Sequence, residues 1–321
     1  MTLSGSATAP VQAYPLSTRI AIEGLGSFFI VFAGLGTALF SPAGSGATIG
    51  FAYGLAMVAA IISFGHVSNG YFNPAFSFGM AVAGRLKFST AVFYMVAQTV
   101  SAVVASVVWL AMMKVMPAGA TPETPQLFGA LANGFDAHSP SQVPMIGVLI
   151  VELIAVGVLT AMLLGATSAR NKTTMGPIAI GLAFAVAVAI TMPLSNGSLN
   201  PARATSVIFL AESWAAGQLW LFWLAPLFGA TLAAVIYRAF APSQSLTVSE
   251  TEPDSEPETV AETVSATVPA TVPGTNGNVA PAATDAPVAA ATDAPVNPAA
   301  TTLAKDKGID DAQAFFDAPK K

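Results

Sequence analysis

The stretch GHVSNGYFNPA at 65–75 ends in a triplet that returns at 200–202, inside SLNPARATS. Asparagine is among the most favoured residues at a helix N-cap, and proline is favoured at the first helical position. Each Asn-Pro-Ala triplet therefore predicts the start of a helix. A short apolar segment follows each triplet, over 74–83 and 201–211. At about 1.5 Å per residue each segment covers roughly 15 Å, so it spans only half of a bilayer core and needs a partner placed end to end.

The composition is that of a membrane protein with a separate polar segment. Of the 321 residues 54% are hydrophobic and 9% are charged, whereas a soluble domain carries about 25% charged residues. Residues 1–242 hold eight Lys or Arg and five Asp or Glu, but 243–321 hold four Lys and twelve Asp or Glu. The sequence pI of about 4.9 is thus a property of the C-terminal segment.

Six apolar runs are long enough to cross a bilayer, which takes about 20 residues of helix. They lie near 19–40, 47–65, 88–113, 145–168, 175–193 and 216–240. Because each half of the chain holds three runs, the second half enters the membrane upside down relative to the first. We predict an all-α membrane protein with six transmembrane helices and two re-entrant half-helices, in an inverted repeat. The channel domain would be 19–240, with repeat one at 19–116, a loop at 117–143 and repeat two at 144–240.

The two halves also carry matched acids. Glu23 lies in the first run of repeat one, 50 residues before Asn73, and Glu152 lies in the first run of repeat two, 48 residues before Asn200. A carboxylate inside a span costs about 2.5–3.5 kcal/mol on insertion scales. We interpret each Glu as the acceptor for the irregular loop of its own half. The alternative is a proton-relay pair in a secondary transporter.

Basic residues predict the orientation. If the spans alternate, six Lys or Arg fall on one side of the membrane: Arg19, Arg85, Lys87, Arg170, Lys172 and Arg238. Only Lys114 and Arg203 fall on the other side. The positive-inside rule then places both termini in the cytoplasm.

The flanking segments suggest no catalytic role. Residues 1–18 lack the basic and apolar regions of a signal peptide, so we expect a cytoplasmic N-terminal segment. Residues 241–321 are rich in Ala, Pro, Thr and Glu without helical periodicity, so we expect a disordered acidic tail. The alternative is a docking motif in DDAQAFFDAPKK at 310–321.

The chain has no cysteine, which excludes disulfides and thiol chemistry. It has two histidines without an acidic cluster, which argues against a metal centre.

The loops before the triplets, NGYF at 69–72 and NGSL at 196–199, must be irregular at membrane depth. Such backbone is tolerated only where it is buried in protein or lines a cavity. Each Asn side-chain oxygen can cap its own helix, which leaves the amide NH₂ to donate into the space between the two helix starts. Each helix N-terminus also carries roughly half a positive charge. Together these groups favour a lone-pair acceptor such as water and repel cations, while loop carbonyls supply a ladder of acceptors.

These motifs resemble the aquaporins of the major intrinsic protein family over 19–240. The resemblance rests on GHVSNGYFNPA, PLSNGSLNPAR, Glu23 and Glu152, and on QLWLFWLAPLFGATLAAVIYR at 218–238, which looks most like bacterial water channels. It implies six spans, two re-entrant half-helices, a homotetramer in the cell membrane, and passive flow of water or small neutral solutes. It implies no enzyme activity, no cofactor and no nucleic-acid partner.

The family's site residues carry over by position. The pore triplets would be Asn73, Pro74, Ala75, Asn200, Pro201 and Ala202, and the carbonyl ladder Asn69, Gly70, Tyr71, Asn196, Gly197 and Ser198. The selectivity filter would comprise Tyr53, Val188, Gly197 and Arg203, and the residues that support the loops Glu23, Glu152 and His66. Water-selective members carry His where this chain has Val188, which predicts a wider and more apolar opening. Glycerol channels carry Asp where this chain has Ala204, which favours the water group.

Purely structural interpretations are alternatives to some of these assignments. Arg203 could be a surface loop residue, and His66 could serve loop packing alone. Gly46, Gly50 and Gly54 form GxxxGxxxG, which predicts close helix packing rather than a site. The sequence thus favours a water channel that also passes ammonia, hydrogen peroxide or urea and excludes protons and ions. Its rivals are a glycerol-type facilitator, a proton-coupled transporter, and a structural protein that acts through its tail.

Overall fold

The structure, a computed structural model, describes residues 14–42, 44–116 and 123–240. Six helices in these ranges are long and apolar enough to cross a membrane. They are α1 (Leu16–Phe40), α2 (Gly46–Ser68), α4 (Phe88–Lys114), α6 (Met145–Ala166), α7 (Gly176–Ser195) and α9 (Ser213–Ala239). The six predicted runs are therefore confirmed, with ends that move by a few residues. The predicted segments 1–18 and 241–321 lie wholly or largely outside the described residues.

Two short helices begin at the triplets, α3 (Pro74–Val82) and α8 (Pro201–Ser206). The second is shorter than its apolar segment predicts, because helical geometry gives way to turns after Ser206. In its last turn the Thr205 hydroxyl donates to the Pro201 carbonyl and the Ser206 hydroxyl to the Arg203 carbonyl. Such bonds back onto the helix weaken and bend it. The structure thus has two re-entrant helices of unequal length.

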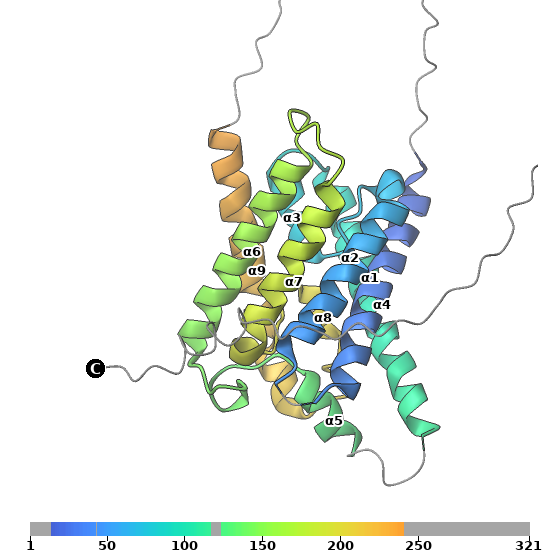
Figure 1. Cartoon of the computed structure of the whole chain (residues 1–321), viewed down its shortest axis with the longest axis vertical. Coiled ribbons are helices and arrows are strands. Elements are labelled where there is room, and N and C mark those ends of the chain that lie inside the picture. Colours follow the sequence, from blue (N-terminus) through green and yellow to red (C-terminus); the bar gives the residue numbers. More distant parts are fainter. Residues whose placement is uncertain (1–13, 43, 117–122, 241–321) are drawn as a thin grey trace, which may run out of the picture. The chain divides into compact units, whose positions relative to one another are not determined.

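The structure describes residues 123–143 of the segment between the repeats. It contains α5 (Thr124–Leu131) and the 3₁₀ turn η1 (Asp136–His138). Phe128 and Leu131 of α5 are buried in a cluster with Val31 and Leu35 of α1. Figure 1 shows α5 at the end of the bundle opposite to the end where α1 begins and α9 ends. This end of the bundle is called here the loop end.

The other end is called here the basic end. Arg85 donates to the Leu164 carbonyl (3.0 Å) and to the Thr167 hydroxyl (2.8 Å), and it also contacts the Tyr237 hydroxyl. Arg238 donates to the Val82 carbonyl (3.1 Å). The C-terminal ends of α3, α6 and α9 are therefore tied together by two arginines.

Helix pairing follows the inverted repeat. α1 packs on α4 and α6 packs on α9, while α2 and α7 cross between the halves and make the most extensive contact. At that crossing a Cβ on Gly54 would run into the Gly181 carbonyl oxygen and Ala185, and a Cβ on Gly181 would run into the Gly54 carbonyl oxygen. The GxxxGxxxG pattern therefore marks close helix packing, as predicted. The exposed faces of the spanning helices carry large apolar side chains, such as Phe51 and Ile62 of α2 and Ile154 of α6, which suits contact with lipid.

We predict that Gly54→Ala destabilises the fold while Gly217→Ala does not. A methyl group at Gly54 overpacks the crossing, and overpacking typically costs about 1–3 kcal/mol. Gly217 has no heavy atom within 4 Å of an added Cβ, so alanine there keeps only its better helix propensity. Thermal unfolding of the purified protein in detergent measures both. Equal melting temperatures for the two variants would contradict the close crossing.

Candidate functional site

The two triplets meet inside the bundle. Asn73 Oδ1 accepts from the Ala75 N–H (2.9 Å), and Asn200 Oδ1 accepts from the Ala202 N–H (2.9 Å). Each asparagine thus caps its own half-helix, with proline at the first helical position. Asn73 Nδ2 also donates to the Leu199 carbonyl (3.0 Å), so a hydrogen bond joins the first triplet to the loop of the other half. One amide hydrogen of Asn73 remains, and Asn200 Nδ2 has no partner among the described residues.

Glu23 of α1 holds the first loop. Its Oε1 accepts from the Ser68 hydroxyl (2.8 Å) and the Tyr71 N–H (3.0 Å). Its Oε2 accepts from the Phe72 N–H (2.6 Å) and from Gln98 Nε2 (2.8 Å). The carboxylate is fully buried, and four donors offset the loss of its hydration. This is the loop-supporting position that the sequence suggests for Glu23.

Glu152 of α6 holds the second loop in the same way, with one donor fewer. Its Oε1 accepts from the Ser195 hydroxyl (2.6 Å) and the Ser198 N–H (3.2 Å), and its Oε2 accepts from the Leu199 N–H (2.8 Å). In the first half Gln98 bridges Glu23 and Ser77. The described residues place no side chain in that role beside Glu152.

Both loops carry backbone strain at matched positions. Phe72 and Leu199, the residues just before the asparagines, have φ of 51° and 52°. Asn69 and Asn196, three residues earlier, have φ of 79° and 63°. Side chains other than glycine in this region cost of order 1–3 kcal/mol each and persist only where the surroundings impose them. At Phe72 and Leu199 the carboxylates impose it, because they bind the N–H groups of these two residues. The N–H groups of Asn69 and Asn196 bond instead to the carbonyls of Gly65 and Met192.

In each loop two N–H groups donate to a glutamate, but most of the loop carbonyls have no donor among the described residues. Among the described residues nothing donates to the carbonyl oxygens of Asn69, Gly70, Tyr71, Gly197 or Ser198. Four of these five residues are buried. A buried carbonyl oxygen normally has a partner, in protein or in water. The sixth predicted ladder member differs, because the Asn196 carbonyl accepts from Arg203 and Asn133.

Arg203 is buried, so the reading as a surface loop residue is wrong. It is 2% exposed, and its Nη2 donates to the Asn196 carbonyl (2.9 Å). Its Nη1 donates to Asn133 Oδ1 (2.6 Å) in the segment between the repeats. Asn133 Nδ2 in turn donates to the Ser195 and Asn196 carbonyls. Sequence reasoning missed Asn133, and the only signal was that a buried guanidinium needs an acceptor outside its own loop.

The other predicted filter residues are buried near this arginine. Tyr53 of α2 is 2% exposed and lies close enough to interact with the guanidinium. The Tyr53 hydroxyl and Arg203 Nε are buried without a partner among the described residues. Val188 of α7 lies beside Gly197, since a Cβ on Gly197 would be 3.2 Å from Val188 Cγ1. The structure thus brings the four predicted filter residues into one region toward the loop end.

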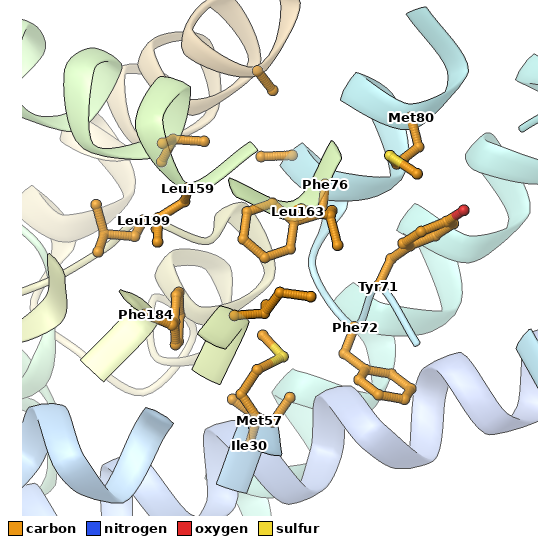
Figure 2. Packing of buried hydrophobic residues seen from close by; sticks show 14 of the residues in the cluster. Ile30, Met57, Tyr71, Phe72, Phe76, Met80, Leu159, Leu163, Phe184 and Leu199 are labelled. Atoms are coloured by element: carbon orange, nitrogen blue, oxygen red, sulfur yellow. The ribbon is translucent and has the colours of Figure 1, made fainter. Parts of the chain in front are cut away.

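The basic end opens into a cavity of about 480 Å³ lined by residues that include His66, Asn69, Tyr71 and Arg85. His66 lies in the last turn of α2 and is exposed, with Tyr14 edge-on to its ring at 6.0 Å. It donates no hydrogen bond to the loop within the described ranges, so it lines the cavity rather than holding the loop. Tyr71 and Met80 of this lining also belong to a buried apolar cluster with side chains from both halves, among them Phe76, Leu163 and Phe184 (Figure 2).

Six spanning helices with two half-helices that meet at their N-termini define an aquaporin-type membrane fold. A family model of the major intrinsic proteins matches residues 11–237. Aquaporin Z of Bradyrhizobium diazoefficiens is 36% identical over 225 residues, which are 68% of this chain and 92% of that relative. Aquaporin Z of Photorhabdus laumondii is 34% identical over 232 residues, which are 70% of this chain and 99% of that relative. The chain belongs to the major intrinsic protein family.

A solved structure supports the fold. The aquaglyceroporin from Plasmodium falciparum superposes with a TM-score of 0.59, over 70% of this chain and 97% of that one. At 19% sequence identity the likeness concerns the arrangement of the helices alone.

We predict that Glu23→Gln lowers the melting temperature of the protein in detergent. Glutamine turns one carboxylate oxygen toward existing donors as an NH₂ group, and each donor left unpaired in the interior costs about 1–3 kcal/mol. Glu123→Gln is the matched control, since Glu123 is exposed and its side chain caps nothing. If Glu23→Gln melts like the wild type, the support of the first loop does not depend on the carboxylate.

Proposed function

We propose that the chain is a passive water channel whose pore runs past the two triplets. The observation that supports it most is the run of loop carbonyls without protein partners on each side of the two asparagines. Buried acceptors in such a row are satisfied by a chain of water molecules, which exchange hydrogen bonds from one carbonyl to the next. Water enters at the cavity of the basic end and leaves past Arg203, or the reverse.

Selection against protons follows from the asparagine pair. The amide hydrogens left on Asn73 and Asn200 donate to a water oxygen at the point where two positive helix ends meet. That water then donates its own hydrogens to neighbours on either side, so it cannot relay a proton through this point. Arg203 adds a fixed positive charge toward the loop end, which repels cations before they reach the triplets.

Small uncharged solutes are the second part of the proposal. Tyr53 and Arg203 offer a hydroxyl and a guanidinium, while Val188 offers an apolar wall. Such a mixed opening suits ammonia, hydrogen peroxide or urea, which pair a few polar groups with little bulk. A glycerol-type facilitator of the same fold is the rival, and Ala204, buried at 2% exposure where glycerol channels carry Asp, speaks against it.

The proton-coupled transporter is disfavoured by the contacts of the two glutamates. Glu23 and Glu152 are both 0% exposed and accept from four and three donors respectively. A carboxylate that relays protons needs a path to water, and these two instead face the strained loops. We further propose that the basic end is cytoplasmic by the positive-inside rule, and that the protein assembles as a homotetramer in the cell membrane.

Stopped-flow light scattering on proteoliposomes tests the function. With an impermeant osmolyte we expect vesicles holding the wild type to shrink several-fold faster than empty vesicles, at a rate that does not change with pH. Glycerol should re-swell them slowly, and a pH-sensitive dye inside should report no added proton leak. Water flow equal to that of empty vesicles would overturn the proposal, and fast glycerol re-swelling would favour the facilitator.

A variant pair tests the exclusion of charge. Asn73→Asp places a carboxylate between the helix ends, where it attracts the cations that the amide repels. We expect a raised proton or cation leak from this variant. Asn171→Asp, in an exposed loop at the basic end, should leak no more than the wild type. Equal leak from the two variants would contradict the role given to Asn73.

A further inference from the structure

Gly197 leaves less room than its lack of a side chain suggests. A Cβ built on Gly197 would lie 2.8 Å from Met192 Sδ and 3.4 Å from Met192 Cγ. A separation under 3.0 Å is closer than real Cβ atoms approach their neighbours. The Met192 thioether therefore crowds the place where any side chain at position 197 would begin.

Met192 shares a helix face with a predicted filter residue. Val188 and Met192 are four residues apart in α7, and residues at this spacing lie on the same face of a helix, one turn from each other. Both touch the space above Gly197. Met192 lies nearer the end of α7, which is the loop end of the bundle, and its side chain keeps part of its surface accessible.

The base of this side chain packs closely against α2. On the side of α2, a Cβ on Gly46 would lie 3.1 Å from Met192 Cβ, so glycine at 46 permits the close approach. Methionine is unbranched, with several rotatable bonds, and fills irregular gaps without fixing one shape.

We propose that Met192 is a fifth filter residue, which narrows the opening that Val188 and Gly197 would otherwise leave wide. This inference rests on the proposed channel function and deepens it. One wall of the opening is then polar, formed by Tyr53 and Arg203, and the facing wall is apolar, formed by Val188 and Met192. The thioether sets the size limit, so single-file water passes while glycerol is held back.

The first test compares solute selectivity. We expect Met192→Ala to raise the ratio of glycerol to water permeability several-fold in proteoliposomes, because the truncation opens the gap above Gly197. Met192→Leu keeps the volume and should keep the ratio near that of the wild type. Met162→Ala, which truncates a methionine on the exposed face of α6, should change nothing. A wild-type ratio in Met192→Ala would overturn the inference.

The second test uses the absence of cysteine from this chain. Met192→Cys introduces a single thiol. A water-soluble methanethiosulfonate forms a mixed disulfide with this thiol and should reduce water flow to the level of empty vesicles. A reducing agent cleaves the disulfide and should restore the flow. Glu123→Cys, at an exposed position outside the spanning helices, should bind the reagent without loss of flow. Flow through Met192→Cys that survives modification, confirmed by mass spectrometry of the labelled protein, would overturn the inference.

The two proposals fail in different ways. A wild type that moves no more water than empty vesicles would overturn the channel and this inference with it. A wild type that conducts water, with a selectivity unmoved by Met192→Ala and a flow unmoved by labelling at position 192, would overturn this inference alone.

Discussion

Two buried carboxylates hold the parts of this molecule that no regular structure could hold. A loop at membrane depth has no water to satisfy its backbone, so its N–H groups need acceptors from the protein itself. Glu23 and Glu152 supply them, and in doing so keep Phe72 and Leu199 in a strained left-handed conformation. Because the N–H groups of these residues point toward the glutamates, the carbonyl oxygens of the same loops remain available as acceptors for a molecule in the proposed pore. The donors that the two carboxylates bind thus offset the loss of their hydration, and the same hydrogen bonds fix the loop carbonyl oxygens in a row.

The halves depend on each other as well as on their own glutamates. The Asn73 amide donates to the carbonyl of Leu199, so the cap of one half-helix is bonded to the loop that precedes the other. α2 and α7 cross nearby through glycines that let the two backbones touch. Figure 1 shows α7 between α2 and α6, and it packs on both, so it contacts helices of both repeats. A polar contact at the centre and a close crossing around it therefore secure one arrangement of the repeats.

The sequence foretold what depends on local chemistry. Apolar length gave the six spans, and Asn-Pro-Ala gave both helix starts, because capping and proline geometry act within a few residues. The matched spacing of Glu23 and Glu152 indicated their contacts, since an inverted repeat converts equal spacing into equal position. Contacts between residues far apart in the sequence, or without a motif, were not predicted. Asn133 binds Arg203 across 70 residues of chain, and Met192 lies against Gly197. No periodicity or motif encodes which side chain of a connecting segment meets a buried charge.

The cavity at the basic end gives the proposed pore two unlike entrances. Passive flow cannot be rectified, because at equal concentrations the fluxes in both directions must balance. The order of events can still differ from side to side. A solute too large for the opening near Arg203 is refused at once when it arrives from the loop end. In the proposed pore, a solute that arrives from the other end first enters the space of about 480 Å³, which there belongs to the path of water. The same solute would then leave water flow unchanged on one side of the membrane and compete with water for the pore on the other.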